Sequence, residues 1–259
     1  MSNLGVAKNG LGHDAESRTS RCTPAAEDYL RAIYGLTMET AAPAPFATTS
    51  AIAERLEVRP ASVTAMLQKL AAATPAMVDY HKSHGARLTA AGERSALAVV
   101  RRHRLLECFL HDRLGYAWDE VHDEADRLEH VISPDLAARL AATLGEPTHD
   151  PHGHAIPAAD LSLPPAALIP VRDLKAGRPA VVRCVSDDDG PALRRLAAAG
   201  VRPGARVAVT ARQADGVLVL RVAGAAAVAL PDALARRVFV ALSDAGDWAA
   251  DRAEPQAAL

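Results

Sequence analysis

The spacing of apolar residues changes near Ile169, and this change limits what the chain can fold into. Before Ile169, several segments place apolar residues three or four positions apart, which predicts amphipathic helices. After it, apolar residues alternate in four short runs, which predicts strands. These runs are 178–185, 205–212, 216–223 and 227–230. Together with one helical segment at 192–204, they predict a small β-barrel that follows a mainly α-helical region.

Residues 48–73 fit the helix-turn-helix pattern of DNA-binding proteins. TSAIAERL predicts a short helix, EVRP a tight turn, and PASVTAMLQKL a longer helix that begins at Pro60. A further helix is expected upstream, at 23–38. Downstream, residues 77–92 alternate in polarity and turn at His84–Gly85, which predicts a two-stranded wing.

The middle of the chain is expected to be helical as well. Helices are predicted at 94–115, 118–132 and 134–145. The segment that follows, 146–165, contains five prolines and few periodic apolar residues, which is typical of a linker. Within it, the HDPHGH stretch at 149–154 is a weak metal-binding pattern, and its proline and glycine favour a plain turn.

Composition narrows the class of protein. Hydrophobic residues make up 49% of the 259 residues and charged residues 23%, which is typical of a folded, soluble protein. The three cysteines lie far apart, so they indicate no disulfide framework, and no apolar run is long enough to span a membrane. The first 22 residues lack the apolar core of a signal peptide. We therefore expect a cytoplasmic protein with a disordered amino-terminal tail.

The charge is unevenly distributed along the chain. Between Arg31 and Arg102, nine Lys or Arg stand against five Asp or Glu, a balance of +4. Residues 119–130 hold six acids and one Arg, a balance of −5. A mildly basic helix-turn-helix next to an acidic helix fits a DNA-binding domain joined to a cation-binding one.

Two successive predicted helices combine imidazoles with carboxylates at spacings of three or four residues, which places these groups on one helix face. The sets are His122, Asp126, Glu129 and His130 in one helix, and His103 and Glu107 in the helix before it. If the two helices pack side by side, they could hold one or two divalent cations between them. The alternative interpretation is two solvated faces with ordinary surface ion pairs.

Four stretches together resemble the diphtheria toxin repressor family of metal-dependent transcriptional regulators. They are EDYLRAIYGL, AIAERLEVRPASVTAMLQKL, RLTAAGERSALAVVRRHRLLECFL and VHDEADRLEHVIS. The similarity covers residues 24 to about 158, and more weakly the β region to about 242. It implies a winged helix-turn-helix domain at 23–95, a helical metal-binding and dimerisation domain at 96–158, a linker at 159–170 and an SH3-like (FeoA-like) domain at 171–243, with tails at 1–22 and 244–259.

The resemblance also implies two metal sites per chain. The primary site would use Asp28, Asp126, Glu129 and His130, and the ancillary site His103, Glu107 and His122 with help from the β domain. Asp189 stands where the third domain of the family can offer a carboxylate. The neighbouring amide ligand of the family falls on Ala192, so Asp187 or Asp188 is an alternative ligand.

The identity of the expected metal depends on two positions. The iron-responsive branch of the family carries a methionine and a cysteine where this chain has Asp28 and Asp126. Carboxylates in place of soft sulfur ligands suit Mn²⁺ and Fe²⁺ and weaken the case for Zn²⁺. The stretch RPASVTAMLQKL also resembles the manganese-responsive branch, so we expect Mn²⁺, with Fe²⁺ as the alternative.

The expected partner is double-stranded DNA with a palindromic operator, bound by a homodimer. Candidate contact residues on the recognition helix and wing are Arg59, Ser62, Thr64, Gln68, Lys69 and Lys82. The resemblance implies repression of metal-uptake genes and no enzymatic activity. Three rival interpretations are a metallohydrolase built on the histidine and carboxylate cluster, a regulator whose effector is not a metal, and a partner-binding module whose terminal barrel docks proline-rich peptides. The sequence contains no HExxH, phosphate-loop or nucleophile motif that would support the first rival.

Overall fold

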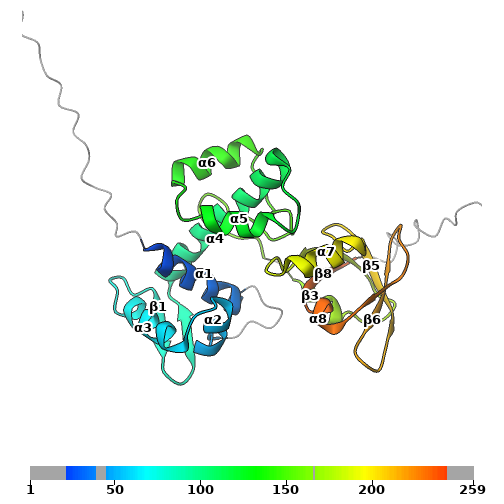
Figure 1. Ribbon diagram of the computed structural model, residues 1–259, viewed down its shortest axis with the longest axis horizontal. Helices are drawn as coiled ribbons and strands as arrows, with labels where there is room; N and C mark the ends of the chain where they lie inside the picture. Colours follow the sequence, from blue (N-terminus) through cyan, green and yellow to red (C-terminus); the bar gives the residue numbers. More distant parts are fainter. Residues whose placement is uncertain (1–21, 39–44, 166, 244–259) are drawn as a thin grey trace, which may run out of the picture.

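The computed structural model describes residues 22–38, 45–165 and 167–243, and the expected tails lie outside this range except for Cys22. The described residues form three groups of elements (Figure 1). We refer to residues 22–88 as the head, to residues 89–158 as the helical middle, and to residues 167–243 as the carboxyl-terminal part.

The head combines three helices with a β-hairpin. Its elements are α1 (Pro24–Met38), α2 (Thr49–Arg55), α3 (Pro60–Ala71), β1 (Val78–His81) and β2 (Gly85–Leu88). Helix α2 begins where the side chain of Thr48 accepts a hydrogen bond of 3.1 Å from the N–H of Ala51, and α3 begins with a proline at its first turn. The fully buried Ile33, Ile52 and Leu67 join these helices in one core. The head therefore contains both the helix-turn-helix and the wing.

The helical middle consists of three helices, and each of them differs in length from the sequence prediction. They are α4 (Ala90–Leu114), α5 (Val121–Leu128) and α6 (Pro134–Thr143). Helix α4 begins before the predicted position 94 because the side chain of Thr89 accepts a hydrogen bond from the N–H of Gly92 and caps it. Helix α5 ends at Leu128, so Glu129 and His130 lie in the turn after the helix and not on its last turn.

The proline-rich segment after α6 is not a linker in its first half, contrary to the sequence prediction. His149 forms a β-bridge with Ala155, and the side chain of Asp150 accepts hydrogen bonds from the N–H groups of His152 (2.8 Å) and His154 (3.0 Å). An isoleucine of the segment packs against α4 and α6 in a cluster of Leu105, Cys108, Ala137, Ala141 and Ile156. Hydrogen bonds and buried apolar contacts therefore fix this segment to the helical middle.

The carboxyl-terminal part is one antiparallel sheet in the order β3-β8-β4-β5-β6-β7. The strands are β3 (Ile169–Pro170), β4 (Pro179–Val185), β5 (Arg206–Arg212), β6 (Leu218–Val222), β7 (Val228–Leu230) and β8 (Val238–Leu242). They are accompanied by α7 (Gly190–Ala198), α8 (Asp232–Ala235) and a 3-10 turn η1 (Val171–Asp173). The sequence prediction missed β3, β8 and α8. Strand β8 is nevertheless central, because Val240 lies opposite both Ile169 and Val182.

Side chains from the helical middle and the head reach the carboxyl-terminal part. The indole of Trp118, in the turn before α5, packs in the core of the sheet and donates a hydrogen bond of 2.9 Å to the carbonyl of Pro151. Asp119 accepts a hydrogen bond of 2.5 Å from Arg194 on α7. These contacts hold the loop after β4 close to α4 and α5. Among the described residues, none of the helices combines the length and the apolar character that a membrane crossing needs.

Candidate metal centre and nucleic-acid interface

The first group of candidate ligands lies between α4, α5 and the loop after β4. His103 and Glu107 come from α4 and His122 from α5, and the packing of these two helices brings them together. Glu107 Oε1 lies 3.1 Å from His103 Nε2 and 3.5 Å from His122 Nδ1. Asp187 from the loop completes the group, with its Oδ2 at 3.5 Å from His122 Nδ1. Two imidazoles and two carboxylates thus converge on one point.

The aspartate of the carboxyl-terminal part that lies with this group is Asp187, and not the expected Asp189. The side chain of Asp189 instead caps α7, where it accepts a hydrogen bond of 2.9 Å from a backbone N–H of the first turn. Asp188 accepts hydrogen bonds from Arg55 of α2 and from Arg237. Only Asp187 of the three consecutive aspartates therefore lies with the candidate ligands, whereas Asp188 and Asp189 both pair with Arg237.

The second group joins the head to the helical middle. Asp28 lies on α1, whereas Glu129 and His130 follow α5. His130 Nε2 donates a hydrogen bond of 2.7 Å to Asp28 Oδ1 and lies 3.3 Å from Glu129 Oε1. The other ring nitrogen, Nδ1, donates to Glu27 at 2.7 Å. Such a carboxylate behind an imidazole fixes the orientation of the ring.

Asp126, the fourth expected ligand of this group, faces in another direction. Its Oδ1 accepts a hydrogen bond of 2.7 Å from Arg31 and lies 3.2 Å from His103 Nδ1. Asp126 therefore forms a group with His103 and Glu129, and not with Asp28. Because His103 belongs to both this group and the first one, the candidate sites are neighbours along α4.

The HDPHGH stretch brings further candidate ligands to the centre, although the sequence favoured a plain turn. His152 is fully buried, and its Nδ1 lies 3.5 Å from Glu107 Oε1 and 4.0 Å from Asp187 Oδ2. With Asp150, these residues form a further group of possible ligands that shares Glu107 and Asp187 with the first one. The Nε2 atom of His152 donates a hydrogen bond of 2.8 Å to the carbonyl of Trp118, which orients the imidazole ring. The three histidines of this stretch were the one feature of the sequence that could have pointed to these candidate ligands.

The electrostatics of the centre depend on these close pairs. Burial disfavours the charged form of His122, but Asp187 and Glu107 outweigh this effect and raise its pKa to about 10. Burial by itself would raise the pKa of Glu107, yet the adjacent His103 lowers it well below its usual value. Negative carboxylates and protonated imidazoles thus neutralise one another, and a cation that binds here takes the place of protons.

Within the part of the chain that the structure describes, several buried polar atoms of the centre lie near oppositely charged groups but form no hydrogen bond, and these atoms test whether a metal fits. They are His103 Nε2, Glu107 Oε1 and Oε2, His122 Nδ1, Glu129 Oε1, Asp150 Oδ2, His152 Nδ1 and His154 Nδ1. Every one of these atoms belongs to a metal-ligating residue type, and unsatisfied buried carboxylate oxygens are costly. Oxygen and imidazole donors of this kind suit a divalent cation, so the residues fit a metal.

The candidate DNA contacts lie on the surface of the head. Five of the six candidate side chains, on α3, at its N-cap and at the tip of the wing, are exposed: Arg59, Ser62, Gln68, Lys69 and Lys82. The sixth, Thr64 on α3, is half-buried. The Thr64 hydroxyl donates to the carbonyl of Pro60 at 3.2 Å, so it is partly engaged within its own helix. The exposed basic residues are placed to contact phosphates.

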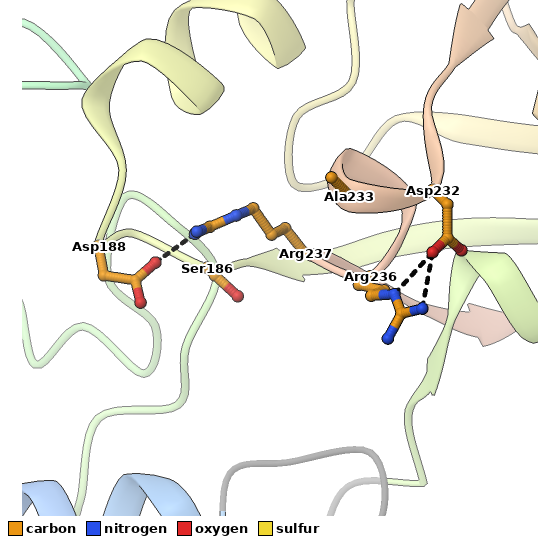
Figure 2. Close-up of a pocket in the computed structure, with 6 residues that line it drawn as sticks. All are labelled: Ser186, Asp188, Asp232, Ala233, Arg236 and Arg237. Atoms are coloured by element: carbon orange, nitrogen blue, oxygen red, sulfur yellow. Dashed lines mark hydrogen bonds and ion pairs between the residues drawn. The ribbon is translucent and has the colours of Figure 1, made fainter. Parts of the chain in front are cut away.

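An open surface hollow lies outside these clusters. Figure 2 shows it on the carboxyl-terminal part, where Arg237 pairs with Asp188 and Arg236 pairs with Asp232. Its lining holds no histidine, and its two arginines are neutralised by carboxylates of the protein itself. The metal centre is therefore the stronger candidate for function.

Three descriptions of known domains match successive parts of the chain. The N-terminal DNA binding domain of iron dependent repressors matches residues 21–86, their metal binding and dimerisation domain matches residues 89–158, and the FeoA domain matches residues 169–242. With the helix-turn-helix and the ligand clusters, these domains define the class as metal-dependent, DNA-binding transcriptional repressors.

Individual relatives support this class over most of the chain. The iron-dependent repressor IdeR of Mycobacterium leprae is 36% identical over 226 residues, which cover 83% of this chain and 95% of the relative. A diphtheria toxin repressor of Corynebacterium efficiens is 34% identical over 202 residues, covering 74% of this chain and 85% of the relative. A solved manganese-dependent transcriptional repressor in complex with manganese is similar with a TM-score of 0.76 and 38% identity, covering 84% of this chain and all of that chain.

The chain therefore belongs to the diphtheria toxin repressor family. It is a metal-dependent transcriptional repressor, and its family is one of DNA-binding proteins, not of enzymes. The fold class and the family expected from the sequence are confirmed.

Proposed function

We propose that this repressor responds to Mn²⁺ and binds a palindromic operator as a homodimer, repressing metal-uptake genes when metal is bound. One observation carries the proposal: Asp28 of α1 lies 2.7 Å from His130, in a group of possible ligands that also contains Glu129. A residue of the DNA-binding domain thus shares a candidate metal site with residues of the metal-binding domain.

The side chains of this group explain how metal would control the head. Asp28 and Glu129 are both negative, and His130 lies between them. When bound, a divalent cation supplies the positive charge that lets carboxylates from both domains share one site. Asp28 then holds α1, and with it the recognition helix α3, in one position relative to α4 and α5. In a twofold dimer this sets the separation of the two α3 helices, which a palindromic operator requires.

We propose two sites per chain. The primary site uses Asp28, Asp126, Glu129 and His130. The ancillary site uses His103, Glu107, His122 and, in place of the expected Asp189, Asp187; these four lie together between the helical middle and the carboxyl-terminal part. Because metal and DNA favour the same conformer, each raises the affinity for the other, typically by about 1–3 kcal/mol.

Manganese is the proposed effector because the ligand groups consist of carboxylates and imidazoles. Across the described residues, none of these groups includes a cysteine. Oxygen-rich sets with imidazole suit Mn²⁺ and Fe²⁺, whereas thiolates favour softer ions. A similar solved structure is named a manganese-dependent repressor, which supports the choice. Fe²⁺ is the second candidate, because a relative of similar length is named an iron-dependent repressor.

We further propose that residues on α3 and the wing contact the operator. Arg59 is the best candidate for a base or phosphate contact because it is exposed at the start of α3. For the dimer, exposed apolar side chains of the metal-binding and dimerisation domain supply a suitable surface. Val131 is 75% exposed and Leu136 43% exposed, both next to the start of α6. Large exposed apolar side chains close together are typical of protein interfaces.

A gel shift on DNA from upstream of the protein's own gene tests this proposal. The purified chain is incubated with the duplex in the presence of Mn²⁺, Fe²⁺, Zn²⁺ or a chelator. We expect retardation with Mn²⁺, weaker retardation with the other ions and none with the chelator. Retardation that persists in the chelator would point to an effector other than metal.

A further inference from the structure

Arg31 places a permanent positive charge inside the candidate metal centre. It lies on α1, one turn after Asp28. Its Nη2 donates a hydrogen bond of 2.7 Å to Asp126 Oδ1, and its Nη1 lies 3.4 Å from Glu129 Oε2 and 3.1 Å from His103 Nδ1. The Arg31 side chain is 24% exposed and that of Glu129 1%. A guanidinium stays protonated at any physiological pH, so it neutralises carboxylates that the proposed function assigns to metal.

The same ion pair, together with His103 Nδ1 at 3.2 Å and His122 Nε2 at 3.7 Å, holds Asp126 in its direction. Three of the four proposed primary ligands already lie together, whereas Asp126 is grouped with His103 and Glu129. Because Arg31 binds Asp126 Oδ1, this carboxylate can turn toward the other ligands only if the ion pair breaks. A largely buried guanidinium that loses its carboxylate partner is costly, so the two arrangements compete.

A second arginine at the centre makes no such contact. Arg102 donates to Glu27 at 2.8 Å and to the backbone carbonyl of Glu129 at 2.7 Å. Arg102 therefore contacts a side chain that orients His130 and a backbone carbonyl, and it leaves the side-chain oxygens of the candidate ligands available. Arg31 differs because it binds the oxygens of ligand side chains directly.

We propose that Arg31 is a tethered competitor of the divalent cation. In the metal-free protein its guanidinium occupies Asp126 and Glu129, and metal binds the primary site only in molecules where Arg31 has released them. The apparent metal affinity is then reduced by the fraction of molecules in the released state. Arg31 thus sets the metal concentration at which the repressor binds DNA. This inference rests on the proposed primary site.

The substitution Arg31→Met removes the charge and keeps an unbranched apolar side chain. We expect isothermal titration of the full-length chain with MnCl₂ to show roughly tenfold tighter binding at one of the two sites, within the usual range of such couplings. The Mn²⁺ concentration for half-maximal binding of the upstream duplex should fall by a similar factor. Arg31→Lys keeps a cation and should stay close to the wild-type values.

Thermal unfolding separates competition from a purely structural role. Metal-free Arg31→Met should unfold at a lower temperature than wild type, because Asp126 and Glu129 lose their cation. At saturating Mn²⁺, the unfolding temperatures of Arg31→Met and wild type should become nearly equal. If Arg31→Met lowers the unfolding temperature equally in the metal-free and the Mn²⁺-saturated protein, and leaves the Mn²⁺ affinity unchanged, the inference is overturned. If Arg31→Met does not fold, Arg31→Gln allows the same measurements with a hydrogen-bonding, uncharged side chain.

A matched control is Arg139→Met on α6. Arg139 also pairs with a carboxylate at 2.8 Å, but both side chains of its pair with Asp135 are mostly exposed and lie outside the ligand groups. The Mn²⁺ affinity of the Arg139→Met protein should equal that of wild type. A wild-type chain without saturable Mn²⁺ uptake would refute the proposed function and the inference together. Wild-type uptake with an equal affinity in Arg31→Met refutes the competition alone.

Discussion

Asp28→Ala is the substitution that isolates the link between the head and the metal centre. The Asp28 side chain is 42% exposed, so its ion pair with His130 contributes at most about 1 kcal/mol to folding. As a ligand it contributes more: even a hydrogen bond to a charged group is typically worth about 1.5–3 kcal/mol, and we take this range for the loss of Asp28. We therefore expect Mn²⁺ to bind the primary site roughly 10- to 100-fold more weakly, while the protein still folds and dimerises.

The assay combines three measurements on the same protein. Isothermal titration gives the Mn²⁺ affinity, thermal unfolding gives the stability, and fluorescence anisotropy of the labelled upstream duplex gives DNA binding at a fixed Mn²⁺ concentration. Asp123→Asn is the control, because Asp123 is an exposed acid of α5, close to the candidate ligands in the sequence, and lies outside the ligand groups. Full Mn²⁺-dependent DNA binding by Asp28→Ala would refute the argument that Asp28 couples metal to the head.

Three further outcomes are expected. Asp126→Cys combined with Asp28→Met should shift the preferred metal toward Fe²⁺ and softer ions in competition titrations, and an unchanged order of affinities would show that these positions do not select the metal. Arg59→Ala should weaken operator binding by about 1–3 kcal/mol if it contacts a base, with no change in the Mn²⁺ affinity of the free protein; an unaltered operator affinity would remove Arg59 from the interface. Mn²⁺ at a hundredfold excess over its Kd should stabilise the folded protein by about 2.7 kcal/mol per site. Removal of Mn²⁺ with EDTA should therefore lower the unfolding temperature. Equal unfolding temperatures with and without Mn²⁺ would contradict a metal site in the folded protein.

Local patterns made the head predictable from the sequence. The helix-turn-helix depends on a short helix, a turn and a proline-initiated helix that are contiguous in the chain, and the structure places α2 and α3 within residues 48–73. The candidate ligands on α4 and α5 could also be found in the sequence, because i, i+4 spacing puts His103 and Glu107 on one helix face. Both predictions rest on geometry within one element or between adjacent ones.

Features that depend on tertiary contacts were not predictable. His152 enters the centre because Asp150 and Ile156 fix a proline-rich turn against α4, and nothing local distinguishes this turn from a solvated one. The sequence could not show that Asp187, and not Asp189, lies with the other candidate ligands, because the helix cap that holds Asp189 forms only in the folded chain. Strand β8 was also missed, because its place in the sheet depends on pairing with β3 and β4, which lie far from it in the sequence.

Diffraction from crystals grown with Mn²⁺, recorded at the manganese absorption edge, tests the central claim most directly, because the anomalous signal locates each ion. The account predicts one ion that has both Asp28 of the head and His130 of the helical middle among its ligands. An ion held only by residues of the helical middle and the carboxyl-terminal part, with Asp28 turned to solvent, would contradict it.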